Sequence, residues 1–147
     1  MIIKELIDGV HLTRLKIIEL ENGNVLKGLK NNEKNYHGFG EAYFSKIKFK
    51  NIKGWSLHKS MTLNLLVPEG RIRFVMFDDR LNSKSKGLFN DITLSEQFYF
   101  RLTVPPYIWV AFQGLNKKCN ILLNIANIIH DPNEVEKKKL EEITFDW

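Results

Sequence analysis

Apolar residues recur at every second position along short stretches of this chain. In RIRFVM (residues 71–76), Ile72, Phe74 and Met76 occupy alternate positions, and a period of two is typical of a β-strand with one buried face. Similar runs rich in Val, Ile, Phe and Tyr lie between clusters of Gly, Asn and Pro; they read VHLTRLKII, NVLKGL, EAYFSKIKF, LNLLVP, DITL, YFRLTVP, WVAFQG and NILLNIANII. Many short strands with almost no helical pattern predict an antiparallel sandwich or a small barrel.

Turn-forming residues mark where the strands end. ENGN (21–24) has Asn-Gly at its centre, which is typical of a hairpin turn, and the polar stretch DDRLNSKSKGLFND (78–91) predicts a long hairpin loop. The Pro-Pro pair at 105–106 ends a strand because proline lacks the amide donor that a ladder needs. DPNEVEKKKLEEI (131–143) departs from this pattern and predicts a short helix or helical turn.

Chain length and charge limit the possible architectures and partners. The 147 residues, 44% of them hydrophobic, can form one core but hardly two, so we interpret residues 1–147 as a single domain. The net charge is +5, and in KIKFK (46–50) the lysines alternate with Ile47 and Phe49, which predicts a half-buried strand with a lysine-bearing face. Such a face attracts phosphates or simply keeps an edge soluble. We favour solubility and expect no nucleic-acid partner.

Cysteine content and the N-terminal sequence bear on the cellular compartment. Cys119 is the single cysteine of the chain, which excludes an internal disulfide framework and a cysteine-rich zinc site. The N-terminal stretch MIIKELIDGVHLTRL contains acidic residues and lacks the apolar region and small-residue cleavage site of a signal peptide. No stretch approaches the ~20 apolar residues of a spanning helix. These features favour a cytoplasmic protein without a membrane partner.

Histidines are the candidates for acid–base chemistry. His11 lies on an amphipathic strand, and His37 lies in the turn NYHGFG. His58, at the end of KGWSLH, and His130 each lie at the edge of an apolar strand. Inward side chains from different strands of a small barrel form layers, so this pair could share a cavity and transfer protons near neutral pH. Alternatively, each is a structural histidine with one hydrogen-bond partner.

The order of several motifs resembles that of a known family. The succession FGEAYFS, KGWSLHKSMTLNLLVPEGRIRFVMFDDR, LTVPPYIWVAFQGL, LLNIANIIHDPNEVE and a final DW resembles the dTDP-4-dehydrorhamnose 3,5-epimerase family of the RmlC-like cupin superfamily. The resemblance runs from Ile7 to Trp147. It implies an all-β double-stranded β-helix, or jelly-roll barrel, with a short C-terminal helical segment. It also implies a homodimer without metal or cofactor that epimerises a 4-keto nucleotide sugar for cell-surface polysaccharide such as O-antigen or capsule.

The residues that the resemblance places in the site differ from the family pattern. Epimerisation next to a ketone needs a base on one face, a proton donor on the other and a stabilised enolate oxygen. The resemblance places the family's base histidine at Ser56, a second histidine at Val110, a lysine near Leu63 and the donor tyrosine at or next to His130. His58 lies two residues after Ser56, and alternate strand residues share a face. We therefore expect His58 to enter the same lumen.

A metal site can be tested against the same positions. Metal-binding cupins need two histidines on alternate strand positions, a glutamate, and a third histidine on a later strand. Those places carry Ser56, His58, Met61 or Thr62, and Val110. One ligand is too few for a divalent ion, so we expect no metal.

Three functions fit these observations. The first is an epimerase or isomerase of altered mechanism, with His58 and His130 as its acid–base pair. The second is a catalytically inactive nucleotide-sugar-binding module, and the third is a structural partner whose sheet face forms a dimer interface. Phosphate-anchoring cations, aromatic rings for stacking and a lumen serine would hold the substrate; these are Lys53, Arg80, Arg101, Trp55, Trp109 and Ser56. A tyrosine could replace the missing acid from another strand; the candidates are Tyr36, Tyr43, Tyr99 and Tyr107.

Overall fold

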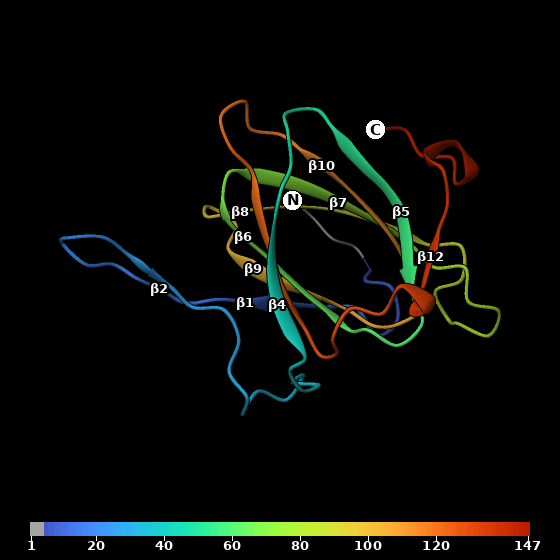
Figure 1. Ribbon diagram of the computed structural model, residues 1–147, viewed down its shortest axis with the longest axis horizontal. Coiled ribbons are helices and arrows are strands. Elements are labelled where there is room, and N and C mark those ends of the chain that lie inside the picture. The colour runs from blue at the N-terminus through green and yellow to red at the C-terminus, as the bar shows by residue number, and fades with distance from the viewer. Residues whose placement is uncertain (1–4) are drawn as a thin grey trace.

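Two five-stranded antiparallel sheets pack face to face in the computed structural model, which describes residues 5–147 (Figure 1). The first sheet has the strand order β1-β9-β6-β11-β4, with bounds His11–Arg14 (β1), Glu41–Lys46 (β4), Leu63–Glu69 (β6), Phe100–Val104 (β9) and Ile121–Ala126 (β11). The second has the order β12-β5-β10-β7-β8, with bounds Ile52–His58 (β5), Arg71–Phe77 (β7), Phe89–Ser95 (β8), Trp109–Gly114 (β10) and Val135–Lys137 (β12). This arrangement confirms the predicted all-β jelly roll. Of the domain expected over 1–147, residues 1–4 lie outside the described residues.

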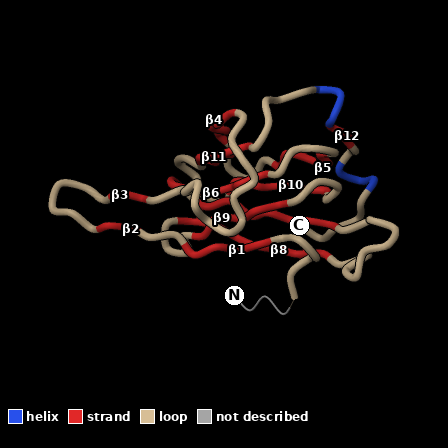
Figure 2. Tube along the Cα trace, turned by 90° about the horizontal axis from the view of Figure 1, so that it is seen from below, coloured by secondary structure: helices blue, strands red, loops and turns tan. Residues whose placement is uncertain are grey.

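The chain outside the two sheets forms one hairpin and two short helical turns. Strands β2 (Ile17–Ile18) and β3 (Val25–Leu26) pair with each other around the predicted ENGN turn and extend away from the sheets in both views (Figures 1 and 2). The expected C-terminal helical segment consists of single 3₁₀ turns, η1 (Pro132–Glu134) and η2 (Leu140–Glu142). No helix within residues 5–147 has the length and apolar content that crossing a bilayer requires.

The core lies between the sheets and is built from the alternating residues. Ile72, Phe74 and Met76 are fully buried there, as their spacing predicted. Strands β6 and β7 belong to different sheets and are joined by a tight turn at Gly70, and their inward side chains share this core. Gly70 has φ of +81°, and a Cβ there would lie 2.1 Å from the carbonyl oxygen of Cys119, so the turn requires glycine.

The C-terminal tail covers the outer face of the second sheet. Trp55 and Trp109 project outward from β5 and β10 and join a second apolar cluster with Ile143. Trp147 packs against Trp55 with ring centroids 6.2 Å apart. The tail therefore closes a face that would otherwise expose two indoles to water.

The predicted strand over KIKFK is wrong. Strand β4 ends at Lys46. The amide of Ile47 donates to the carbonyl oxygen of Asn120 at 3.0 Å, and Lys50 has φ of +64°, a left-handed conformation that interrupts a strand. The segment after Lys46 is therefore a loop, and the side chain of Ile47 packs into the core.

Candidate active site

A cavity of about 210 Å³ lies between the two sheets. Its wall from the first sheet comes from β4, β6 and β11, and its other wall comes from β5, β10 and β12. The apolar lining consists of Leu63, Leu65, Val110, Phe112, Leu122 and Val135. The polar lining consists of Tyr43, Ser45, Ser56, His58, Asn124, His130 and Lys137. A concave site that combines apolar walls with convergent polar groups is typical of a small-molecule site.

His58 is held by a carboxylate from the other end of the chain. Its Nδ1 lies 2.5 Å from Oε1 of Glu134, which is 76 residues away in sequence. The other carboxylate oxygen of Glu134 accepts the backbone amides of Ser60 at 2.9 Å and Met61 at 3.2 Å. In the neutral imidazole, donation by Nδ1 to the carboxylate leaves Nε2 without a proton, which is the form a general base needs.

The position of Glu134 follows from local structure. Asp131 caps η1 by accepting the amide of Asn133, and β12 then pairs with β5 so that Val135 lies opposite His58. This pairing brings the preceding residue, Glu134, against the imidazole. Burial raises the pKa of Glu134, but the hydrogen bonds from His58, Ser60 and Met61 outweigh burial and hold that pKa below its ordinary value. Glu134 is therefore ionised at neutral pH.

A tyrosine faces the cavity from the opposite sheet. Tyr43 on β4 pairs with Asn124 on β11, and the amide nitrogen of Asn124 donates to the phenol oxygen at 2.8 Å. Asn124 is itself fixed because its side-chain oxygen accepts the amide of Asn64. Since the phenol oxygen is an acceptor in this bond, its own proton is free to be donated to a ligand.

Three further polar residues line the cavity and come from different segments of the chain. Ser56 lies opposite Val110 in the β5–β10 ladder and lines the same cavity as His58, as alternation predicted for the two. Lys137 is opposite Ser56 in the β5–β12 ladder and contributes a cation. His130 lines the cavity but is exposed, and its amide donates to Glu41 at 2.6 Å. The cavity thus contains both histidines that were expected to converge.

The two tryptophans considered for stacking lie outside the cavity. Trp55 is 1% exposed, and its indole nitrogen donates to the carbonyl oxygen of Leu140 at 3.3 Å. Trp109 is also buried, with the ammonium of Lys138 4.6 Å from its ring centroid. The C-terminal tail occupies the aromatic faces that a sugar or base would need.

Two of the three cations considered for phosphate already have partners. Both oxygens of Asp78 accept from the guanidinium of Arg80 at 2.9 Å. Arg101 is fully buried on β9, where it pairs with Glu33. Lys53 is exposed on β5 and is not among the residues that line the cavity. Lys137, which sequence reasoning did not single out, is the lysine that lines it.

Glu134, Asn124 and Lys137 were missed in the sequence because their roles depend on contacts between distant strands. Glu134 belongs to HDPNE, a block that the sequence singled out for a helical turn and for its resemblance to a family, not for a role in the site. No spacing rule links it to His58. In the part of the chain from residue 5 onward, no group of three or more His, Cys, Asp or Glu side chains is arranged to hold a metal ion.

Several known proteins are similar to this chain over most of its length. A solved dTDP sugar isomerase from Desulfovibrio desulfuricans G20 is 31% identical, with a TM-score of 0.89, over 92% of this chain and 87% of that one. The spore coat polysaccharide biosynthesis protein SpsL of Bacillus subtilis (strain 168) is 23% identical over 97% of both chains. A dTDP-4-dehydrorhamnose 3,5-epimerase from Elizabethkingia anophelis NUHP1 shares the fold, with 20% identity and a TM-score of 0.81, over 99% of this chain and 84% of that one. No protein-family model matches the chain.

Proposed function

Since the chain belongs to the RmlC-like family of dTDP-sugar epimerases, we propose that it epimerises or isomerises a 4-keto nucleotide sugar used for cell-surface polysaccharide. The reaction needs no cofactor in this scheme, because side chains transfer the protons. The observation that carries the proposal is the His58–Glu134 pair in a cavity whose opposite wall presents Tyr43. A reaction on a nucleotide sugar also fits the cytoplasmic location that the sequence favours.

His58 is the general base in this mechanism. Its Nε2 removes the proton from the carbon next to the ketone, and the electron pair of the broken C–H bond moves to the carbonyl oxygen as an enolate. The imidazolium that forms is stabilised by ionised Glu134 on Nδ1. The carboxylate therefore both selects the tautomer and offsets the developing positive charge.

Tyr43 is the proton donor. It belongs to the first sheet and His58 to the second, so a sugar ring between them presents one face to each. Tyr43 gives its phenol proton to the enolate carbon on the face opposite His58, which inverts that carbon and restores the ketone. Solvent then reprotonates the phenolate and takes the proton from the His58 imidazolium, so both side chains return to their starting states. We assign this step to Tyr43 rather than His130 because the Tyr43 proton is free for donation, whereas His130 lies at the exposed rim.

Lys137 and Ser56 provide the stabilising contacts. Both line the cavity and lie opposite each other in the β5–β12 ladder. Lys137 is exposed at the cavity mouth, and its ammonium would stabilise the negative charge that develops on the enolate oxygen. Ser56 supplies a hydroxyl donor where the resemblance places a histidine.

We further propose that the protein acts as a homodimer. Tyr43 and Ser45 line the cavity, so Phe44 between them faces outward from the first sheet, and it is 67% exposed. Leu123 lies beside it in the β4–β11 ladder. An exposed aromatic on a sheet face is favoured at protein interfaces.

Hydrogen exchange into the substrate tests the proposed reaction directly. The protein is incubated in D₂O with dTDP-, CDP- and GDP-linked 4-keto sugars, and deuterium at the carbons next to the ketone is followed by NMR or mass spectrometry. We expect deuterium exchange with at least one sugar and its abolition in His58→Ala. In Tyr43→Phe, we expect inversion of the carbon to be lost, while deuterium still enters from the His58 face.

His37→Ala is the matched control because His37 is exposed in a loop away from the cavity. It should exchange at the wild-type rate. Binding of these sugars by the wild-type protein with no exchange at any carbon would overturn the enzyme proposal and support a nucleotide-sugar-binding module. Exchange that persists in a folded His58→Ala protein would show that another group is the base.

A further inference from the structure

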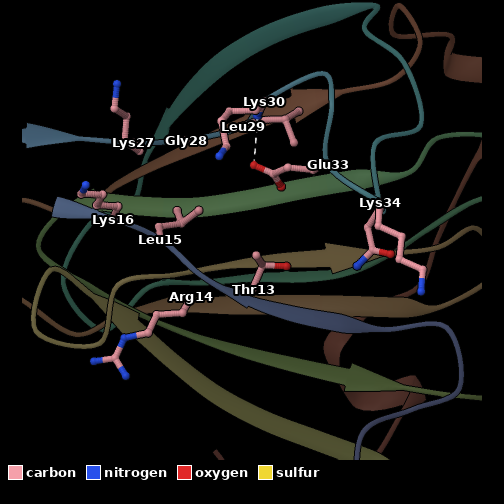
Figure 3. A pocket seen from close by; sticks show the side chains of 11 residues that line it. Thr13, Arg14, Leu15, Lys16, Lys27, Gly28, Leu29, Lys30, Glu33 and Lys34 are labelled. Atoms are coloured by element: carbon pink, nitrogen blue, oxygen red, sulfur yellow. Dashed lines mark hydrogen bonds between the residues drawn. The ribbon is translucent and has the colours of Figure 1, made fainter.

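A second cavity, of about 590 Å³, lies outside the barrel lumen (Figure 3). Its lining comes from the end of β1 with the residues that follow it and from the segment after β3. Five cationic residues line it: Arg14, Lys16, Lys27, Lys30 and Lys34. Glu33 is the single acidic residue among the described residues that line it. Such an excess of positive charge around a concave surface attracts anions.

This second cavity is on the outer face of the first sheet. Leu102 and Val104 on β9 point into the core, so Arg101 and Thr103 point outward. Arg101 pairs in the ladder with Thr13, which lines the second cavity. The lumen lies on the inner face of the same sheet, so the sheet itself separates the two sites.

Arg101 fixes the segment that forms the cavity. Its guanidinium donates to the carbonyl oxygen of Gly28 at 2.8 Å and to Oε2 of Glu33 at 2.5 Å. Burial raises the pKa of Glu33, but the bonds from Arg101 outweigh it, so this pKa lies below its ordinary value. The amide of Lys30 donates to the other oxygen of Glu33, as the dashed line in Figure 3 shows.

Pairing with Arg101 neutralises the one carboxylate and leaves the lysines available. Within residues 5–147, no ion pair involves any of the five cationic lining residues. The Nε of buried Arg101 also has no hydrogen-bond partner in this part of the chain. Arg101 therefore anchors Gly28 and Glu33 at this cavity, and the lining has more positive than negative side chains.

We propose that this outer-face cavity binds a diphosphate group carried by an organic molecule. Ammonium groups on several sides suit a multiply charged anion, and Leu15 and Leu29 provide apolar surface for the group attached to it. Thr13 and Asn35 add hydrogen-bonding side chains. The site does not use the lumen residues, so it extends the function of the protein beyond the proposed reaction.

Calorimetric titration of the full chain with inorganic pyrophosphate tests the site. We expect binding that weakens with added salt and that falls about tenfold in Lys30→Gln/Lys34→Gln, since each exposed ionic contact contributes modestly. Lys117→Gln/Lys118→Gln, which removes two exposed lysines elsewhere, should bind as the wild type does. Titrations with farnesyl diphosphate and with dTDP then show whether the site prefers a diphosphate attached to a lipid or to a nucleoside.

The lumen provides the second control. His58→Ala/Lys137→Gln alters the barrel cavity alone and should retain this pyrophosphate binding. Unchanged binding in Lys30→Gln/Lys34→Gln, or loss of all binding in the lumen variant, would overturn the proposal. Because Lys30 and Lys34 are exposed, their replacement should leave the unfolding temperature unchanged, which separates loss of the site from loss of the fold.

Discussion

In the proposed mechanism, Glu134 determines which nitrogen of His58 acts as the base, through its contact with Nδ1. In Glu134→Gln the amide NH₂ can donate to Nδ1, which moves the ring proton to Nε2 and removes the base. We expect kcat for deuterium exchange to fall by about 10²-fold or more with little change in KM. Steady-state exchange kinetics measure both constants.

Glu136→Gln is the control for this change. Glu136 lies two residues away on β12, is about half exposed and pairs with Lys59 at 3.3 Å. It should keep the wild-type kcat. A Glu134→Gln protein with normal kcat and only reduced stability would mean that the carboxylate merely anchors the Ser60 and Met61 amides.

At the scale of elements, the long loop between β7 and β8 is organised by a buried carboxylate. Asp78 is fully buried, and it accepts hydrogen bonds from Arg80, Ser83 and Ser85. Burial raises its pKa, but these bonds outweigh burial and hold the pKa far below its ordinary value. The stability that Asp78 contributes is therefore complete above the ordinary aspartate pKa and is lost only as the pH falls through strongly acidic values.

Asp78→Asn should lower the free energy of unfolding by about 2 kcal/mol, because the guanidinium of Arg80 loses its ionic partner. Urea denaturation at neutral pH measures this change. Asp79→Asn, at the exposed neighbouring position, should leave the midpoint unchanged. Equal midpoints for the two variants would show that the loop contributes little to global stability.

At the scale of the whole molecule, Phe44 and the projecting β2–β3 hairpin leave apolar surface uncovered in a single chain. We expect wild-type protein to sediment as a dimer and Phe44→Glu to shift it to monomer, since burying an unpaired carboxylate at the interface is costly. Leu81→Glu places the same charge at a position that is 80% exposed in the β7–β8 loop and should remain dimeric. Analytical ultracentrifugation distinguishes the outcomes; a monomeric wild type would contradict the proposed dimer.

The sequence alone determined the strand pattern and part of the site. Alternation predicted the burial of Ile72, Phe74 and Met76, because successive strand side chains must point to opposite faces. The same rule placed Ser56 and His58 together. It was insufficient at KIKFK, where strand β4 ends at Lys46 and the left-handed conformation of Lys50 interrupts the extended backbone despite a strand-like pattern.

Tertiary structure decided which partner each polar side chain meets. Periodicity assigns a residue to a face of the sheet but does not say what covers that face. Trp55 is enclosed by the C-terminal tail, although the next residue, Ser56, lines the lumen. Arg101 is likewise buried against Glu33. The pairing of His58 with Glu134 joins residues 76 positions apart through the β5–β12 ladder. Such long-range contacts form only when the sheets pack, and they determine the tautomer of His58 on which the proposed chemistry depends.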